Sequence, residues 1–395
     1  MCRPDLQFAA DNCRRAVGLL ALMLMIVPSV HGAGEPENRN GLSLHGEFAI
    51  GKEGRLILIP VELDGQVYRF LLDTGACRSG FDTSLRDALG EQQGTQWLQT
   101  PAGRKRVPTY DWPEATFKGQ SLKRDRPVIC LDFADLRQGS SEQIVGVIGM
   151  DVMRDCRLQI NFDRGQARFL KSLPARREEL GVRIPIEFSV DGAPHVVGVI
   201  AENVSERFLI DTGAQGNSLR SELFDQLLEQ NLVEMGGAFT NATVGGEVQG
   251  NRGRLLKLSV GSDTQERLRV ARINLSSLGL RYLSRFQVTF DFPGSAVYLR
   301  KGEHYAKSEP RATSGLTLGW IDGQVVVGHV KDGGPAATAG MRSNDILVQV
   351  NGKSTSDYDH FSLRQLLTSE AGRKVSVRFR RAEREFDAEL TLHQE

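Results

Sequence analysis

The sequence has no excess of charge of either sign, because lysine plus arginine and aspartate plus glutamate each number 49. This balance gives no support to a polyanionic partner such as nucleic acid. Histidines such as His195, His304 and His360 are scattered, without the spacing of metal ligands. The 395 residues leave room for two or three domains with proper cores.

Cysteine is scarce. Of five cysteines, only Cys77, Cys130 and Cys156 follow the N-terminal segment, and their spacing matches no zinc pattern. Two interpretations stay open for them. An exported chain can form one disulfide and keep one free thiol. Alternatively, all three are small buried hydrophobic residues.

No apolar run reaches the roughly 18 residues that a membrane span needs. Arg14 and Arg15 precede an apolar run from Ala16 to Val30, and Gly32 suits a cleavage site. We therefore predict a signal peptide over residues 1–32, with an uncleaved anchor as the alternative. No cysteine stands directly after the run, which disfavours a lipoprotein anchor. We expect a periplasmic or extracellular protein with no stable membrane insertion and, after cleavage, a net charge of −1.

Two nearly identical octapeptides are the strongest feature that the sequence does contain. Residues 69–76 read RFLLDTGA and residues 207–214 read RFLIDTGA, so the copies differ only at Leu72 and Ile210. Each copy is an apolar, strand-like run that ends in Asp73 or Asp211. A single Asp-Thr-Gly also forms ordinary turns. Two copies, each directly after the same kind of apolar strand, indicate that the chain contains one structural motif twice.

The Asp-Thr-Gly-Ala stretch resembles the active-site loop of retropepsin-like aspartic proteases. The resemblance implies that Asp73 and Asp211 face each other, share one proton and activate a water molecule, with no metal and no cofactor. It also implies supporting roles for the rest of the two loops. These supporting residues are Thr74, Gly75, Ala76, Thr212, Gly213 and Ala214.

Further segments of each half carry the same resemblance. Gly149 and Gly279 each stand at the end of a segment that resembles the family's second signature, two apolar residues and a glycine that thread behind the catalytic loop, although Ser277 departs from the apolar preference in the second copy. About thirty residues after each Asp, Gly103 and the pair Gly245 and Gly246 are candidates for the tips of flaps that close over substrate. The resemblance divides the chain into an N-terminal lobe at 33–172 and a C-terminal lobe at 173–303.

Residues 304–312 are polar and predict a linker, and residues 313–395 resemble a PDZ domain. The resemblance rests on the Gly-Pro-Ala run at 334–336 and on the Asp-Ile-Leu-Val-Gln-Val-Asn-Gly run at 345–352. It implies binding of protein C-termini, by strand addition, at a carboxylate-binding loop. The candidate binding residues of that loop are Gly315, Leu316, Thr317 and Leu318.

The predicted fold is mainly β, with two retropepsin-like β-barrel lobes related by pseudo-twofold symmetry and a small α+β PDZ domain. The predicted function is that of an exported aspartic endopeptidase acting on polypeptides. The alternative is a catalytically inactive scaffold that binds peptides through its PDZ domain. The segment 171–180 between the halves also leaves open a dimer in which two chains exchange halves.

Overall fold

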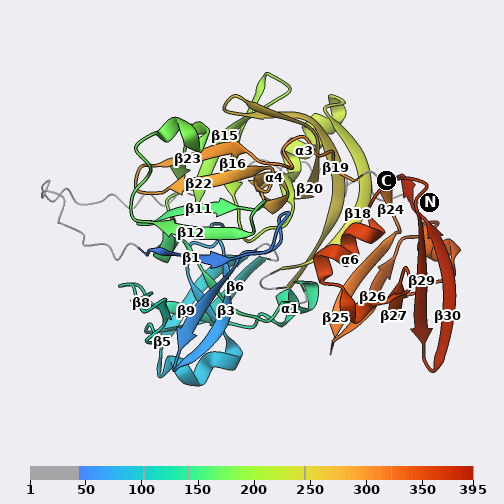
Figure 1. The fold of residues 1–395 in the computed structure, drawn as a ribbon, viewed down its shortest axis with the longest axis horizontal. Coiled ribbons are helices and arrows are strands. Elements are labelled where there is room, and N and C mark those ends of the chain that lie inside the picture. Colours follow the sequence, from blue (N-terminus) through green and yellow to red (C-terminus); the bar gives the residue numbers. More distant parts are fainter. Residues whose placement is uncertain are drawn as a thin grey trace, which may run out of the picture. The chain divides into compact units, whose positions relative to one another are not determined.

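The computed structural model describes residues 44–100, 103–140, 142–243, 246–310, 312–321 and 323–394. The predicted signal peptide and the flap candidate Gly245 lie outside these ranges. The fold is mostly β, as predicted (Figure 1). In the part of the chain that is described, no helix is both long enough and apolar enough to span a bilayer.

The N-terminal half is built on a nine-stranded sheet. Its strands, in spatial order, are β5 (Gln92–Thr100), β6 (Gly103–Tyr110), β9 (Val128–Leu131), β4 (Gly80–Asp82), β10 (Ile144–Ile148), β3 (Gln66–Leu72), β2 (Leu58–Leu63), β7 (Thr116–Phe117) and β8 (Gln120–Ser121). Asp64 and Gly65 have positive φ angles of 51° and 74°, which suits the tight turn of the β2–β3 hairpin.

The C-terminal half is built on an eight-stranded sheet that repeats this plan. The strands, in order, are β14 (Glu187–Phe188), β15 (Pro194–Ile200), β16 (Val204–Ile210), β21 (Ser277–Leu278), β17 (Asn217–Arg220), β20 (Asp263–Ile273), β19 (Gly246–Val260) and β18 (Val233–Thr243). Strand β15 also pairs with β19, so this sheet closes on itself as a barrel.

A third sheet of six strands combines both halves. Its order is β1 (Gly46–Ala49), β12 (Gln166–Leu170), β11 (Arg157–Asn161), β22 (Phe286–Asp291), β23 (Ala296–Lys301) and β13 (Val182–Pro185). Figure 1 shows five of these strands, β1, β12, β11, β22 and β23, side by side. The junction is the antiparallel pair β11–β22, which joins the first half to the second along five residues of each strand.

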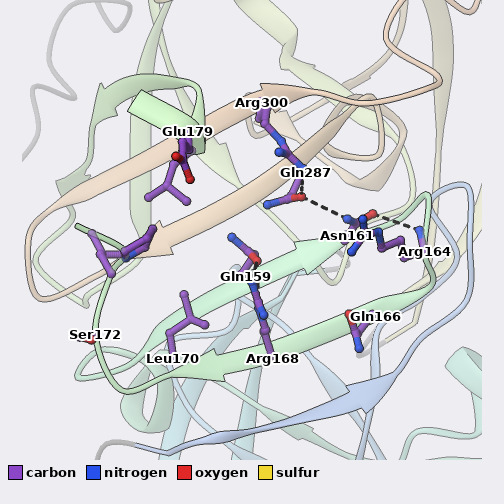
Figure 2. Close-up of a pocket in the computed structure, with 13 residues that line it drawn as sticks. Gln159, Asn161, Arg164, Gln166, Arg168, Leu170, Ser172, Glu179, Gln287 and Arg300 are labelled. Carbon is purple, nitrogen blue, oxygen red and sulfur yellow. Dashed lines mark hydrogen bonds between the residues drawn. The ribbon is translucent and has the colours of Figure 1, made fainter. Parts of the chain in front are cut away.

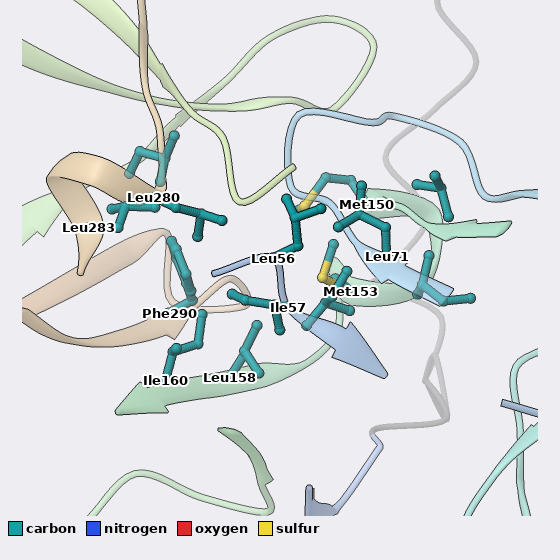
Figure 3. Packing of buried hydrophobic residues seen from close by; sticks show 14 of the residues in the cluster. Leu56, Ile57, Leu71, Met150, Met153, Leu158, Ile160, Leu280, Leu283 and Phe290 are labelled. Carbon is teal, nitrogen blue, oxygen red and sulfur yellow. The ribbon is translucent and has the colours of Figure 1, made fainter. Parts of the chain in front are cut away.

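The two faces of this six-stranded sheet differ, because side chains alternate along each strand. One face is polar and carries Gln159 and Gln287 (Figure 2). The other face is apolar and includes Leu158, Ile160 and Phe290, which belong to the main core together with Met150 and Leu280 (Figure 3).

The helices in the described part of the chain are short and lie between strands. The α-helices are α1 (Ala134–Ser140), α2 (Met150–Met153), α3 (Ser221–Glu229), α4 (Leu280–Leu283), α5 (Pro335–Thr338) and α6 (His360–Leu367), and the 3-10 helices span Thr83–Leu89, Arg177–Leu180 and Thr355–Asp357. The helix after Asp82 is a 3-10 helix, and the Asp82 side chain caps it by accepting from the amide of Ser84.

The C-terminal region has its own core around Val327, Leu347 and Leu363. Its main sheet has the order β25 (Leu316–Ile321), β26 (Gln324–Val330), β27 (Ile346–Val350), β29 (Lys374–Arg381) and β30 (Arg384–Thr391). The short strand β28 (Lys353–Ser354) pairs with β27, and β24 (Ala312–Thr313) pairs with β31 (His393–Gln394). Helix α6 begins after Asp359, whose side chain caps it by accepting from the amide of Ser362.

Cys77, Cys130 and Cys156 are free thiols, so the structure contains no disulfide among them. Cys130 and Cys156 are buried in the core of the first half, as the second sequence-based interpretation predicted for them. Cys77 is partly exposed.

Candidate active site

Two parallel strand pairs place Asp73 and Asp211. Strand β3 ends directly before Asp73 and lies parallel to β10, while β16 ends directly before Asp211 and lies parallel to β21. The amide of Asp73 donates to the carbonyl of Ile148 at 3.0 Å, and the amide of Asp211 donates to that of Leu278 at 3.0 Å. The same backbone contact therefore fixes both residues at the end of a buried strand.

Each aspartate faces the glycine of the other loop. A Cβ atom added to Gly75 would lie 2.8 Å from the Cγ of Asp211, and one added to Gly213 would lie 2.3 Å from the Cγ of Asp73. These distances are too short for a side-chain carbon. The predicted pseudo-twofold relation thus brings the two carboxyl groups together, with glycine as the residue that leaves them room.

Two buried threonines hold the loops together. The amide of Thr74 donates to the Oγ1 of Thr212, and the amide of Thr212 donates to the Oγ1 of Thr74, both at 3.0 Å. Each hydroxyl in turn donates across the interface, Thr74 to the carbonyl of Ile210 at 2.6 Å and Thr212 to that of Leu72 at 2.7 Å. The hydrogen bonds between the two loops therefore form a reciprocal set.

Backbone amides orient the carboxylates within each loop. The Oδ1 of Asp73 accepts from the amides of Gly75 at 2.8 Å and Ala76 at 3.1 Å. Asp211 accepts at 2.9 Å from the amide of Gly213 and from that of the residue after it, Ala214. Both loops thus use one carboxylate oxygen for positioning, and the second oxygen of each group is not committed to these amides.

Burial raises the pKa of both carboxyl groups. For Asp73, loss of solvation is the largest influence, and the loop amides only partly oppose it. For Asp211, loss of solvation acts first and the charge of Asp73 adds to it, so its pKa lies well above the usual value. Each carboxyl group also influences the pKa of the other, because the two lie next to each other. Two carboxyl groups in such contact retain one shared proton over a wide pH range.

The predicted glycines Gly149 and Gly279 lie directly behind the loops. A Cβ on Gly149 would be 2.6 Å from the carbonyl oxygen of Ala76, and one on Gly279 would be 2.5 Å from that of Ala214. The residues that follow, Met150 and Leu280, donate their amides to the same two carbonyls at 2.8 Å. Both glycines therefore permit a close backbone contact that locks the loop from behind.

Sequence reasoning missed the side chains that complete this contact. The amide of Gly149 donates to the Oγ of Ser79 at 3.0 Å, and the amide of Gly279 donates to the Oδ1 of Asn217 at 3.2 Å. Ser79 and Asn217 each lie six residues after the catalytic candidate of their own half. A polar residue at the same offset in both copies is the signal that identifies them.

The two halves differ in what supports these polar residues. Asp151 accepts from both the amide and the hydroxyl of Ser79, the latter at 2.6 Å. Loss of solvation raises the pKa of Asp151 despite these donors. No such carboxylate accompanies Asn217, because Arg281 occupies the corresponding position after Gly279.

Cys77 follows the first loop and is partly exposed. Burial, together with the neighbouring Asp191, raises the pKa of Cys77 to about 12. The thiol stays neutral near physiological pH and is a poor nucleophile. The geometry gives it no part in the chemistry of the aspartates.

The flap candidates form matching hairpins. Strands β5 and β6 close at Thr100 and Gly103, and strands β18 and β19 close at Thr243 and Gly246. In both hairpins the threonine Oγ1 donates to the glycine carbonyl at 2.7 Å. Gly103 and Gly246 have φ angles of 125° and 136°, a region that favours glycine. The candidate Gly245 is outside the described residues.

The candidate peptide-binding residues of the C-terminal region lie at the start of an edge strand. Gly315 has a φ of 78°, and Leu316, Thr317 and Leu318 begin β25, which is the first strand of its sheet. An edge strand offers unpaired backbone groups to an incoming extended peptide.

Comparisons with known proteins identify two parts of the chain. Residues 59–152 match the family described as aspartyl protease, and residues 326–381 match the PDZ domain family. The first match includes Asp73 and Gly149, whereas the second copy of the motif lies outside it. Among curated proteins, none matches this sequence.

One solved structure with a similar part is described as "photosystem II D1 C-terminal processing protease". It is 27% identical over 21% of this chain and 23% of its own, with a TM-score of 0.21. This chain thus spans about a quarter of that protein, and the low TM-score gives the likeness no weight here. The family matches agree with the predicted architecture: the chain contains a retropepsin-like aspartyl protease domain and, after it, a PDZ domain.

Proposed function

We propose that this chain is an exported aspartic endopeptidase in which Asp73 and Asp211 form one active site within a single polypeptide. The observation that carries the proposal is the reciprocal contact of each aspartate with the glycine of the opposite loop. A turn that served only structure would not need a second carboxyl group at that position. The aspartyl protease match over residues 59–152 supports the same assignment.

The chemistry follows from one proton shared by two carboxyl groups. The charged carboxylate takes a proton from a water molecule, whose oxygen attacks the carbonyl carbon of the scissile peptide bond. The protonated carboxyl donates to the carbonyl oxygen and stabilises the oxyanion of the tetrahedral intermediate. Transfer of a proton to the amide nitrogen then breaks the C–N bond and releases two peptides. The bonds from the amides of Gly75, Ala76, Gly213 and Ala214 keep both carboxyl groups in place throughout.

The surrounding elements suit a polypeptide substrate. We propose that the two glycine-tipped hairpins, β5–β6 and β18–β19, close over an extended chain as flaps. We also propose that the PDZ domain binds protein C-termini at β25 and so acts as a substrate or regulatory clamp. The predicted signal peptide supports export to the periplasm or beyond.

The test is a peptide-library digest of the mature protein beside its Asp73→Asn and Asp211→Asn variants. We expect each variant to lose at least about a thousandfold in kcat/KM, because the shared proton requires both carboxyl groups. Asp64→Asn, at the exposed tip of the β2–β3 hairpin, is the matched control and keeps full activity. Cleavage by the native protein is expected to be sensitive to pepstatin. Substantial turnover by either dyad variant defeats the one-site mechanism.

The alternative is an inactive scaffold that binds peptides through the edge strand of its PDZ domain. It predicts no cleavage of the library by the native protein, together with binding of C-terminal peptides. The same digest therefore separates the two functions.

A further inference from the structure

A second polar site lies on the six-stranded sheet, on the face away from the core. Two neighbouring rows of directly opposed residues cross the strands there. The first row contains Gln166, Asn161, Gln287 and Arg300, and the second contains Arg168, Gln159 and Thr289. Except for Thr289, these side chains line one cavity of about 480 Å³ and are drawn in Figure 2.

The chain between the two halves walls this cavity on one side. Leu173 and Leu180 pack with Ala296 and Tyr298 in a small apolar cluster of their own. That cluster fixes the segment 172–180 beside the polar face. The cavity therefore has a polar floor and a partly apolar wall, and both halves of the chain contribute to it.

Buried amides hold two arginines over the floor. Gln159 is only 6% exposed and its Oε1 accepts from the Nε and Nη2 of Arg168, at 2.9 and 2.6 Å. Gln287 is 8% exposed and its Oε1 accepts from Arg300 and from Asn161. A guanidinium group has five N–H donors, so these contacts leave donors of both arginines for a further acceptor.

The charge of the cavity is not balanced. Of the described residues, none forms an ion pair with Arg164, Arg168 or Arg300, which all line the cavity. By contrast, Arg157 in the next row is paired with the buried Asp291 at 3.0 Å. Glu179 is the one carboxylate that the lining contains. Three arginines facing one glutamate leave an excess of positive charge.

We propose that this cavity binds a small anion with two or more carboxylate or phosphate groups, and that the bound anion clamps the two halves together. Guanidinium groups bind both kinds of oxygen in a bidentate manner. Arg168 reaches from β12 to β11 and Arg300 from β23 to β22, so their head groups lie roughly 8 Å apart, one strand and one row from each other. That spacing suits a ligand with several anionic groups. The site is independent of the proposed protease activity.

Calorimetric titration of the full chain tests the site, with citrate and pyrophosphate as separate probes at constant ionic strength. We expect at least one of them to bind and to raise the temperature of unfolding, because a ligand that binds only the folded state stabilises it. Binding of citrate alone assigns carboxylates, binding of pyrophosphate alone assigns phosphates, and binding of both assigns the shared anionic chemistry. Failure of both to bind at about 10 mM, where even weak binding is detectable, overturns the proposal.

Variants establish where the anion binds. We expect the double variant Arg168→Gln, Arg300→Gln to bind at least about tenfold more weakly, since each charge-assisted hydrogen bond contributes about that factor. Ser172→Asp, an exposed change in the wall, should weaken binding as well without disturbing the fold. The matched control Lys123→Gln, Lys257→Gln removes two surface charges elsewhere, one from each half. Equal weakening in that control would show unspecific attraction and contradict the site.

Discussion

At the scale of single residues, the site requires glycine at positions 75 and 213. We expect Gly75→Ala and Gly213→Ala each to lower kcat/KM by at least about a hundredfold, because the new Cβ would displace the opposing carboxyl group. Gly216→Ala is the matched control, since a Cβ there meets no atom within 4 Å. Peptide cleavage assays of all three variants check this. Wild-type activity of Gly213→Ala would contradict the close approach.

The raised pKa of Asp211 makes a prediction about stability and pH. The folded protein binds a proton at Asp211 more tightly than the unfolded chain does, for which the usual value is 3.8. Stability due to this proton is therefore present at low pH and is lost as the pH rises through the folded-state pKa. In the Asp211→Asn variant, the side-chain oxygen would still accept from the amides of Gly213 and Ala214, and the side chain would carry no charge.

We therefore expect Asp211→Asn to raise the free energy of unfolding at about pH 8. The gain should shrink on acidification and vanish below about pH 4, where the native carboxyl is protonated in both states. Thermal unfolding of the two proteins across this range measures it. If the Asp211→Asn variant is less stable than the native protein at every pH, the charge of Asp211 does not destabilise the fold.

The repeated octapeptide predicted the aspartates, threonines and glycines of the loops, because repetition is visible in a sequence. Ser79 and Asn217 were missed, since they differ in type although they act alike. Asp151 has no counterpart in the second half, so no repeat could reveal it. The proposed anion site could not be predicted from the sequence, because its residues become neighbours only through the register of four strands.

At the scale of elements, the segment after β23 is bound to the C-terminal half. Glu309 is buried and lies 3.5 Å from the guanidinium of the buried Arg285. Its other oxygen accepts from the amide of Arg269 at 3.1 Å. Tyr305 packs on Phe286. Much of the polar stretch predicted as a linker at 304–312 is thus packed against the C-terminal half. The buried carboxylate of Glu309 holds it there, because a buried charge needs a partner of opposite charge, here Arg285.

Because Glu309 is packed against the C-terminal half, the point at which the chain is cut to remove the PDZ domain affects the stability of that half. We expect a chain that ends after Pro310 to fold and to cleave short peptides normally, and to cleave long polypeptides at an altered rate. A chain that ends after Lys301 should be destabilised by about 3–5 kcal/mol, because Arg285 loses its buried partner. Unfolding and cleavage assays of both truncations check this.

Two outcomes would contradict that prediction. Equal stability of the two truncations would mean that Glu309 contributes nothing to the fold. Unchanged rates on both short and long substrates would mean that the PDZ domain is only an appendage to the protease lobes.

Element prediction succeeded where apolar alternation is strong and failed where it is weak. The apolar runs before Asp73 and Asp211, predicted to be strand-like, lie in β3 and β16. The long strands β18 and β19 were not predicted as strands, because glycines such as Gly236, Gly237, Gly250 and Gly253 interrupt their pattern. Their pairing with each other and with β20 overrides that weak local preference.

At the scale of the whole molecule, the two protease halves contact each other outside the active site as well as within it. Strands β11 and β22 pair along five residues of each, and the reciprocal threonine bonds add a second junction. Two separate chains would have to lose translational freedom to build such a site, whereas here the chain itself supplies both halves. We expect the two halves to unfold in one cooperative transition.

Dilution then distinguishes a single-chain enzyme from a dimer that exchanges halves, because both would contain the same contacts. We expect kcat/KM per molecule to stay constant from micromolar to nanomolar concentration, since an intramolecular interface does not depend on concentration. Sedimentation of the same samples should give the mass of one chain throughout. A specific activity that falls on dilution together with a shift from dimer to monomer would favour exchange. In that case the segment 171–180 would be the hinge, and lengthening it with flexible residues should restore the monomer, because a longer connection lets both halves meet within one chain.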